Sequence, residues 1–322
     1  MIDRTGPALA LAVAAAVTSS TSGPFGKLLL EAGWSVGAVA TARTGIASLA
    51  LVPLALWTAR RRPVRLRGRL RSVTALGVVG TAGTIVCYFN AVSRLPVGVA
   101  MMVMYTAPVL VLLYAWLRYG DRPGRRTLLG AASCVGGLFA VVGATGVDRP
   151  DPVGIAWAMG AAVCVATYFL SSDRAVAGIP PTVLGCLALL LATATTFVLG
   201  VAGALPLHVG ADVVRMGGAR VPALVPLLLV ALVSTVFTYV AGMAAVRALG
   251  ARLTSFVGLS ELVATLGSAW LLLGEAPRPV QLAGGALIVL GVLLIREPVQ
   301  TAMPSETVVG AGATSSRTTS GS

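Results

Sequence analysis

The chain has 322 residues, of which 57% are hydrophobic and 11% charged, and its mean hydropathy is +0.90. A soluble core could not bury this much apolar surface, so the composition excludes an ordinary globular protein and predicts one embedded in a lipid bilayer. The formal net charge of +13 would favour nucleic-acid binding in a soluble domain. Here the arginines lie in short connections between apolar segments, so no nucleic-acid partner is expected.

Ten apolar segments follow one another along the chain, each near the roughly 20 residues that cross about 30 Å of hydrocarbon. They cover residues 7–28, 36–58, 73–92, 97–118, 126–146, 153–171, 180–204, 222–246, 251–273 and 279–296. The first is expected to remain as a helix and not to be a cleaved signal peptide, because nine more segments follow it. The polar connection 205–221 is expected to be a solvated loop, and the Thr-, Ser- and Gly-rich residues 297–322 a disordered cytoplasmic tail.

The two halves of the chain repeat one pattern at a spacing of 154 residues. At this spacing Ala115–Asp121 (AWLRYGD) aligns with Ala269–Glu275 (AWLLLGE), Gly130 with Gly284, and Gly137 with Gly291. The chain is therefore expected to hold two five-helix repeats, at 7–146 and 153–296. Because five is odd, the second repeat must cross the membrane in the opposite direction, around a central cavity. The predicted fold class is an all-α integral membrane protein of ten transmembrane helices.

The positive charge sets the expected orientation of this fold. If the N-terminus is cytoplasmic, 17 of the 24 Lys and Arg fall on the inside, six fall on the outside, and Arg43 lies within the segment 36–58. The connection Arg60–Arg71 alone holds seven arginines. Cytoplasmic connections of membrane proteins carry such an excess, so we expect a multi-pass protein of the cell membrane with both termini in the cytoplasm.

Several short motifs resemble those of one transporter family. They are Ser22–Lys27 (SGPFGK), Ala42-Arg43, Tyr105–Pro108 (YTAP) with Gly120-Asp121, and Leu259–Glu261 (LSE) with Gly274-Glu275. On these the chain resembles the EamA-type members of the drug/metabolite transporter superfamily, which have ten helices in two repeats. The chain departs from the family pattern at two positions. Asp121 stands where the family usually has Glu. Leu262 stands where the family commonly has a proline after the glutamate matched by Glu261, and proline is the usual cause of a helix kink.

The resemblance implies a secondary transporter that exports a small polar metabolite, such as an amino acid or a related compound, without ATP hydrolysis. Efflux of drugs or toxic compounds and import of metabolites are alternatives within the same fold. A membrane-embedded enzyme or sensor is a remote alternative, because the apolar segments hold no carboxylate pair, histidine cluster or nucleophile with its base. The four cysteines lie in four different segments and indicate buried small residues, so no metal, cofactor or disulfide is expected.

Small and polar residues form stripes along several of the predicted helices. On the segment 251–273, for example, Gly258, Glu261 and Thr265 share one face. Such stripes line a polar cavity or let helices pack closely, and both readings remain open. The residues expected to contact a substrate are Glu261, Tyr88, Asn90, Tyr105, Thr238, Tyr239, Ser260 and Arg43. The tyrosines suit a metabolite with apolar and polar parts because each offers a ring and a hydroxyl.

The two charged residues of this set have alternative roles. Arg43 lies roughly 10 Å below the outer end of its helix, so it either reaches the membrane surface or attracts an anionic group in the cavity. Glu261 lies near the bilayer centre, where an ionised carboxylate costs at least about 2.5–3.5 kcal/mol unless it is paired or hydrated. It is expected to bind a substrate's amino group, to carry a proton in exchange for substrate, or to bond a neighbouring helix.

A further set of residues is expected to be structural. Gly130 and Gly284 belong to glycine-rich segments without phosphate-loop spacing, so they indicate close helix packing. Asp121 and Glu275 each follow a glycine at a helix end, where the acid can anchor the N-terminus of the next helix. Pro108 is placed in the same structural group.

The arginine-rich connection provides a test of the orientation. We expect a cysteine introduced at Gly68 to be protected from an impermeant thiol reagent in intact cells and to react after permeabilisation, because residues 60–71 are expected in the cytoplasm. A cysteine introduced within 205–221 is the control and should react in intact cells. Reaction of Gly68→Cys from outside would contradict the inverted-repeat topology.

Overall fold

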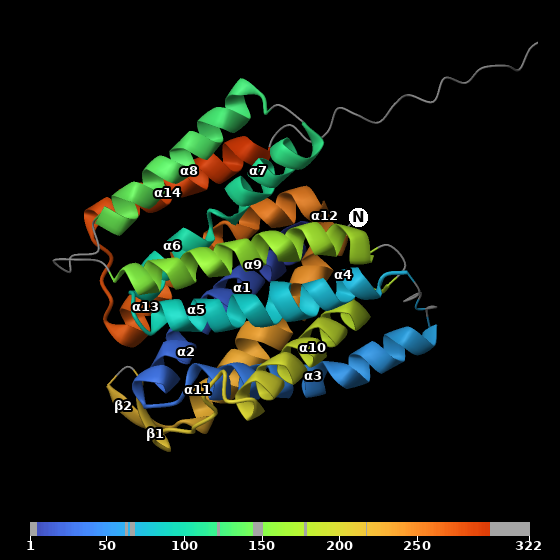
Figure 1. The fold of residues 1–322 in the computed structure, drawn as a ribbon, viewed down its shortest axis with the longest axis vertical. Coiled ribbons are helices and arrows are strands. Elements are labelled where there is room, and N and C mark those ends of the chain that lie inside the picture. The colour runs from blue at the N-terminus through green and yellow to red at the C-terminus, as the bar shows by residue number, and fades with distance from the viewer. Residues whose placement is uncertain are drawn as a thin grey trace, which may run out of the picture.

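The computed structural model describes residues 5–61, 64, 68–120, 123–143, 151–176, 179–216 and 218–296. The elements of the first half, drawn from blue to green in Figure 1, are α1 (Thr5–Ser20), α2 (Ser22–Glu31), α3 (Val36–Arg61), α4 (Leu70–Thr74), the π-helix η1 (Ala75–Gly83), α5 (Thr84–Val92), α6 (Val97–Met104), α7 (Ala107–Tyr119) and α8 (Arg125–Gly143). Those of the second half are α9 (Pro152–Val176), α10 (Pro181–Val201), β1 (Val213–Met216), β2 (Ala219–Pro222), α11 (Leu224–Leu228), the π-helix η2 (Leu229–Phe237), α12 (Thr238–Gly258), α13 (Ser260–Leu273) and α14 (Pro279–Arg296). Asp121 and the tail 297–322 lie outside the described residues.

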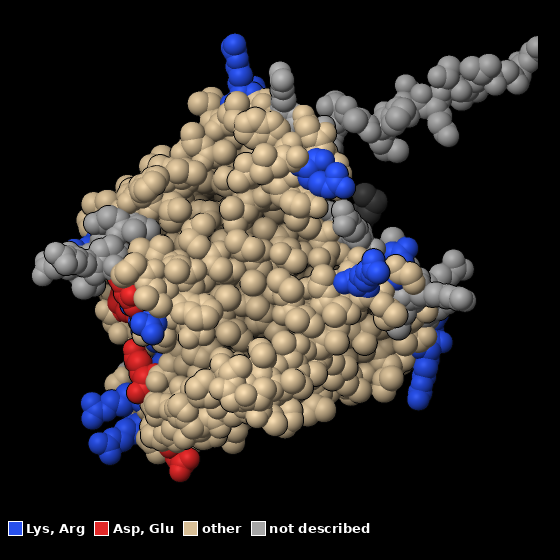
Figure 2. Space-filling view, in the orientation of Figure 1, with Lys and Arg blue, Asp and Glu red and all other residues tan. Residues whose placement is uncertain are grey.

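Seven helical stretches among the described residues are long and apolar enough to cross a membrane. They are Gly6–Glu31, Val36–Arg61, Leu70–Val92, Val97–Tyr119, Pro152–Ser171, Pro181–Val201 and Leu224–Gly250. On the face shown in Figure 2, charged side chains gather at the ends of the helices, and the surface between them carries almost none. This pattern confirms the prediction of a helical, multi-pass membrane protein, because a hydrocarbon layer excludes exposed charge.

One connection departs from its predicted form. The second part of 205–221 is an antiparallel hairpin in which Val214 faces Val221, and Val214 is only 3% exposed. The sequence carries Gly217-Gly218 between two short runs that contain β-branched residues, which is a hairpin signal that the prediction of a plain loop passed over. The hairpin packs beside α2 at the left of Figure 1.

The duplication is visible in the backbone itself. At the spacing of 154 residues η1 corresponds to η2, and the turn at Tyr105 between α6 and α7 corresponds to the turn at Leu259 between α12 and α13. Gly120 and Gly274, which correspond in the same way, both end a helix in the left-handed conformation with φ of 74°. The segment 251–273 is thus interrupted at Leu259, although Leu262 replaces the proline that usually causes a kink.

Glycines allow α8 and α14 to pack against each other with almost no space between their backbones. A Cβ atom at Gly130 would lie 2.6 Å from the carbonyl oxygen of Gly291, and one at Gly137 would lie 2.5 Å from that of Gly284. The two helices are therefore antiparallel. The contact of Gly130 with Gly291 is repeated by the contact of Gly284 with Gly137, which are the corresponding residues of the other repeat. This supports the structural role predicted for Gly130 and Gly284.

Two adjacent glycines of α8 test this packing. We expect Gly137→Ala to lower the midpoint of thermal unfolding in detergent, since its Cβ must displace the α14 backbone, and overpacking of this kind costs about 1–3 kcal/mol. Gly136→Ala is the matched control, because a Cβ atom there meets nothing within 4 Å. Equal midpoints for the two variants would contradict the close contact.

Candidate functional site

Three adjoining cavities lie among the helices of the two repeats. Cavity A, of about 350 Å³, is lined by Met101, Met104, Tyr105, Ala107, Pro108, Val165, Phe169, Gly258, Leu259, Glu261 and Val292. Cavity B, of about 160 Å³, is lined by Ser19, Ser20, Ser22, Gly23, Arg43, Thr84, Ile85, Tyr88, Met101, Met104, Glu261 and Thr265. Cavity C, of about 400 Å³, is lined by Ser19, Arg43, Gly80, Thr81, Thr84, Ile85, Val165, Tyr168, Phe169, Gly185, Ala188, Leu189, Thr235 and Tyr239. Shared lining residues join A to B and B to C.

Glu261 stands in the wall between cavities A and B. It lies in the first turn of α13, where the helix dipole favours a negative group. Ser19 Oγ donates to Glu261 Oε1 at 2.6 Å. The hydroxyl of Tyr105 lies 3.3 Å from both Glu261 Oε2 and the carbonyl oxygen of Gly258, and its one proton can go to either acceptor. Among the described residues, each carboxylate oxygen therefore lies within reach of one hydroxyl group, and the carboxylate also borders both cavities. The arrangement can hold a cation or a proton at this position.

Arg43 contributes a positive group to cavities B and C. Its Nε donates to the hydroxyl of Thr235 at 3.1 Å, and its guanidinium carbon lies 5.6 Å from the centre of the Phe89 ring. Both contacts orient the side chain among the helices and not along the membrane surface. Arg43 and Glu261 do not pair with each other: among the described residues the ion pairs are Lys27 with Glu275 and Arg94 with Asp151. Cavity B thus carries one group of each charge.

Three of the predicted tyrosines also reach the cavities. Tyr105 lines cavity A, Tyr88 lines cavity B and Tyr239 lines cavity C. Tyr88 is 7% exposed and packs against Gly23, where a Cβ atom would lie 2.4 Å from its hydroxyl oxygen. The hydroxyl of Tyr239 donates to the carbonyl oxygen of Pro181. The rings of Tyr88 and Tyr239 are therefore held in place.

The remaining predicted substrate contacts lie away from the three cavities. Asn90 Nδ2 donates to the carbonyl oxygen of Val86, one turn earlier in its own helix, at 2.9 Å. The hydroxyl of Thr238 shares a hydrogen bond with that of Thr18 on α1 at 2.8 Å. Ser260 Oγ donates to the carbonyl oxygen of Val257 at 2.6 Å. These side chains are engaged within or between helices, and their contact with a substrate stays a prediction.

Small and polar residues on α9 and η2 likewise face neighbouring helices. On α9, Gly160 lies against Cys87, and Cys164 lies against Gly83, where a Cβ atom would approach its sulfur to 2.8 Å. On η2, the hydroxyl of Ser234 shares a hydrogen bond with that of Thr21 at 2.7 Å. By contrast, the stripe on 251–273 turns toward the cavities, because Gly258 lines cavity A, Thr265 lines cavity B and Glu261 lines both.

The sequence reasoning missed several residues that line the site. Ser19 belongs to a polar run in the first apolar segment that could be mistaken for a cleavage signal. Thr235 lies next to Ser234 on η2, in a run of apolar residues. Met101 and Met104 carried no signal, since an apolar residue in a membrane helix is unremarkable until its neighbours are known. Their flexible thioethers can adapt to apolar groups of different shape.

The predicted structural residues take specific positions. Pro108 lies in the first turn of α7, where its missing N–H is not needed, and it lines cavity A. Glu275 does anchor a helix N-terminus, but that of α6 and not that of the following α14. It accepts the backbone N–H of Val97 at 2.8 Å and also pairs with Lys27. This contact joins the second repeat to the first.

Comparison with known proteins agrees with this architecture. The model of the EamA-like transporter family matches the chain twice, over residues 6–143 and 152–296. A Streptantibioticus cattleyicolor protein named as a "Probable terminal-alkyne amino-acid exporter" is 29% identical over 266 residues, which cover 82% of this chain and 84% of that protein. A solved structure described as "Crystal structure of protein" has a similar fold, with a TM-score of 0.55, 22% identity, and coverage of 90% of this chain and 97% of that chain. The two family matches span nearly all of the helices, so the chain belongs to the EamA-like transporter family and is a transporter and not an enzyme.

Proposed function

We propose that the protein exports an amino acid or a closely related zwitterion across the cell membrane. One observation carries the proposal: cavity B holds the Arg43 guanidinium and the Glu261 carboxylate without an ion pair between them. A zwitterion can place its amino group at Glu261 and its carboxylate at Arg43, and so match both charges in one small cavity. The exporter name of the 29% identical relative supports this substrate class.

Cavity A suits the rest of such a substrate. It opens from the shared residues Met101, Met104 and Glu261, and its wall is mainly apolar, with Phe169 and Val292. An amino acid bound by its charged groups in cavity B would extend its side chain among these groups. We therefore expect apolar side chains to be preferred over charged ones, because a charged group in cavity A would lose its water without gaining a partner.

The architecture proposed for transport is two inverted repeats of five transmembrane helices with both termini in the cytoplasm. The antiparallel contact of α8 with α14 supports the inversion, because these helices occupy corresponding places in the two repeats. The arginine-rich connection Arg60–Arg71 supports the orientation. Inverted repeats can exchange their conformations around a fixed central site, which is the basis of alternating access.

Efflux of a drug or another apolar compound is the second candidate. The mainly apolar wall of cavity A favours it, since such a compound could bind there without using Arg43. The two candidates differ in whether transport requires a carboxylate on the substrate. Import of the same zwitterion would use the same site, and the direction of accumulation in cells separates it from export.

Glu261→Gln tests the amine contact. The amide keeps the shape of the side chain and an acceptor for Ser19 or Tyr105, but it cannot ionise. We therefore expect the apparent KM for the amino acid to rise roughly 30-fold, which corresponds to the loss of about 2 kcal/mol from one hydrogen bond to a charged group. The measurement is exchange of labelled amino acid in proteoliposomes, at several pH values. Ser260→Ala is the matched control, because its hydroxyl bonds Val257 away from the cavities.

The outcome also decides between the roles of Glu261. Loss of pH dependence with unchanged apparent KM would assign the carboxylate to proton exchange in place of amine binding. Transport like that of the parent protein at every pH would contradict both roles and leave Glu261 as a helix-to-helix contact.

Arg43→Ala tests the carboxylate contact. We expect the parent protein to prefer an amino acid over the amine that lacks its carboxylate, and the variant to lose most of this preference, by on the order of tenfold or more. Arg43→Lys keeps the charge but loses the planar fork, so it should fall between the two. An unchanged preference in Arg43→Ala, at normal protein levels, would favour the drug-efflux candidate.

A further inference from the structure

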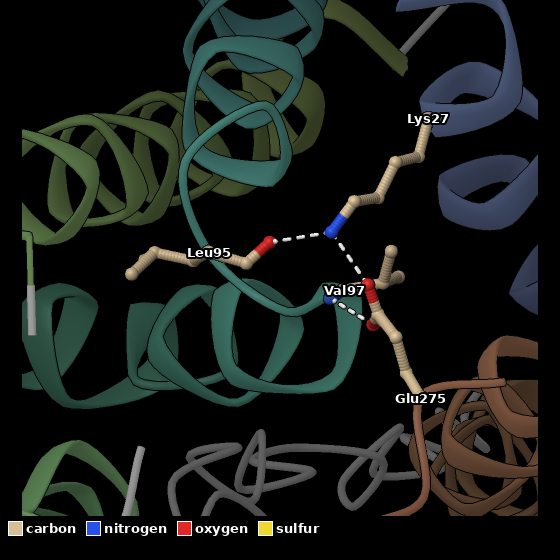
Figure 3. Close-up of polar contacts among 4 residues, drawn as sticks. All are labelled: Lys27, Leu95, Val97 and Glu275. Atoms are coloured by element: carbon tan, nitrogen blue, oxygen red, sulfur yellow. Dashed lines mark hydrogen bonds and ion pairs between the residues drawn. The ribbon is translucent and has the colours of Figure 1, made fainter. Parts of the chain in front are cut away.

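A half-buried ion pair joins the two repeats at one end of the molecule. Lys27 Nζ lies 2.5 Å from Glu275 Oε1 and donates to the carbonyl oxygen of Leu95 at 3.2 Å (Figure 3). The second carboxylate oxygen of Glu275 accepts the backbone N–H of Val97 at 2.8 Å. The side chains of Lys27 and Glu275 are 15% and 21% exposed. We call this pair the latch, because α2, the turn before α6 and the segment after α13 meet at it.

A closely packed layer separates the latch from cavity B. A Cβ atom at Gly23 would lie 2.5 Å from Val97 Cγ1, and one at Gly98 would lie 2.5 Å from Leu266 Cδ2. The helices α2, α6 and α13 can approach this closely only because two of the positions carry no side chain. Gly23 also lines cavity B, so this layer is the wall of the cavity on the side of the latch.

The latch and the site are carried by the same helices. Val97 begins α6, and Met101, one turn further, lines cavities A and B. Glu275 follows the C-terminus of α13, whose first turn holds Glu261, roughly 20 Å away at 1.5 Å per residue. Lys27 lies on α2, directly after α1, which supplies Ser19 to Glu261. Separation of α2 from α13 at the latch must therefore displace groups that line the site.

We propose that Lys27 and Glu275 form a gate that closes one end of the substrate path and must separate in every transport cycle, a role that rests on the proposed transport by alternating access. An ion pair suits this task because both partners are stable when paired and, at the membrane edge, also when separated and hydrated. In the proposed topology this end faces the outside of the cell. The structure then represents the state that is closed to the outside.

Access to the cavity tests the gate. Met101→Cys, with the native cysteines replaced, serves as the reporter for an impermeant thiol reagent added to each side of proteoliposomes. We expect Glu275→Gln and Lys27→Met each to raise the labelling rate from the latch side on the order of tenfold, equivalent to about 1.4 kcal/mol. Glutamine still offers an oxygen to Val97, so the α6 N-terminus stays anchored. Unchanged rates in both variants would overturn the proposal.

Arg94→Gln is the matched control, because it removes a second ion pair that the described residues form at the same end. Arg94 Nη1 lies 3.2 Å from Asp151 Oδ2 and joins the turn before α6 to the residue before α9, but the side chains are 47% and 33% exposed. The backbone N–H of Val153, together with Arg94, holds the pKa of Asp151 below its usual value. Exposed pairs contribute little, so labelling should stay within about twofold of the parent. A tenfold rise here as well would overturn the proposal in favour of a general loosening of this end.

A reversible cross-link provides an independent test. A bifunctional methanethiosulfonate reagent is used to join Lys27→Cys to Glu275→Cys, and the unlinked double variant is the reference. We expect amino-acid exchange to fall to background in the linked protein and to return after reduction. Exchange that persists in the linked protein would overturn the gate. A parent protein that exchanges no amino acid would instead contradict the proposed function, and the labelling comparison, which needs no substrate, would still decide on the gate.

Discussion

Backbone polar groups within hydrocarbon must find their hydrogen bonds inside the protein, so a membrane helix can be interrupted only where protein or a cavity covers the break. In this chain the breaks at Thr21, Tyr105 and Leu259 and the π-helices η1 and η2 all border cavities A, B or C. Carbonyl groups that lose their regular helical hydrogen bond at these breaks can accept one from a nearby side chain. For example, Thr235 Oγ1 donates to the carbonyl oxygen of Val230, five residues earlier. These five departures from regular helix therefore lie beside the site, where protein or cavity covers them. Gly250, which also interrupts α12 with a φ of 82°, lines none of the three cavities.

The duplicated scaffold gives the site its shape but not its charges. At the spacing of 154 residues Glu261 corresponds to Ala107, and both lie in the first turn of a helix that faces cavity A. Each repeat thus directs a helix N-terminus at the cavity, and only the second places a carboxylate there. Arg43, from the first repeat, supplies the opposite charge. The two repeats are nearly symmetric, but the charges that they place in the cavity are opposite. Such a cavity can orient a substrate that carries a positive group at one end and a negative group at the other.

The length of the apolar segments predicted membrane helices because the thickness of the hydrocarbon sets that length. The repeat in the sequence predicted that corresponding elements recur in both halves. Glu261 could be placed in a cavity because a carboxylate at its depth requires a partner or water. Its donor Ser19 is 242 positions away, and the latch joins Lys27 to Glu275 across 248 positions. Such pairs depend on how the repeats dock, which local periodicity does not encode. Thr238 shows the same limit, since a hydroxyl that faces a cavity and one that bonds a neighbouring helix have the same spacing.

The contacts that hold the site and those that close the latch are made by the same pair of neighbours, which are the helical stretch Gly6–Glu31 (α1 and α2) and the helix α13 with the residues just after it. Ser19 on α1 donates to Glu261 at the start of α13, and Lys27 on α2 pairs with Glu275 just beyond the end of α13. A substrate amine at Glu261 would compete with Ser19 for the carboxylate, so binding alters the contact at one end of this pair. Closely packed helices shift largely as rigid bodies, so such a change is carried to the other end of α13 without any separate pathway. Substrate binding and gate opening can therefore be coupled through the position of a single helix.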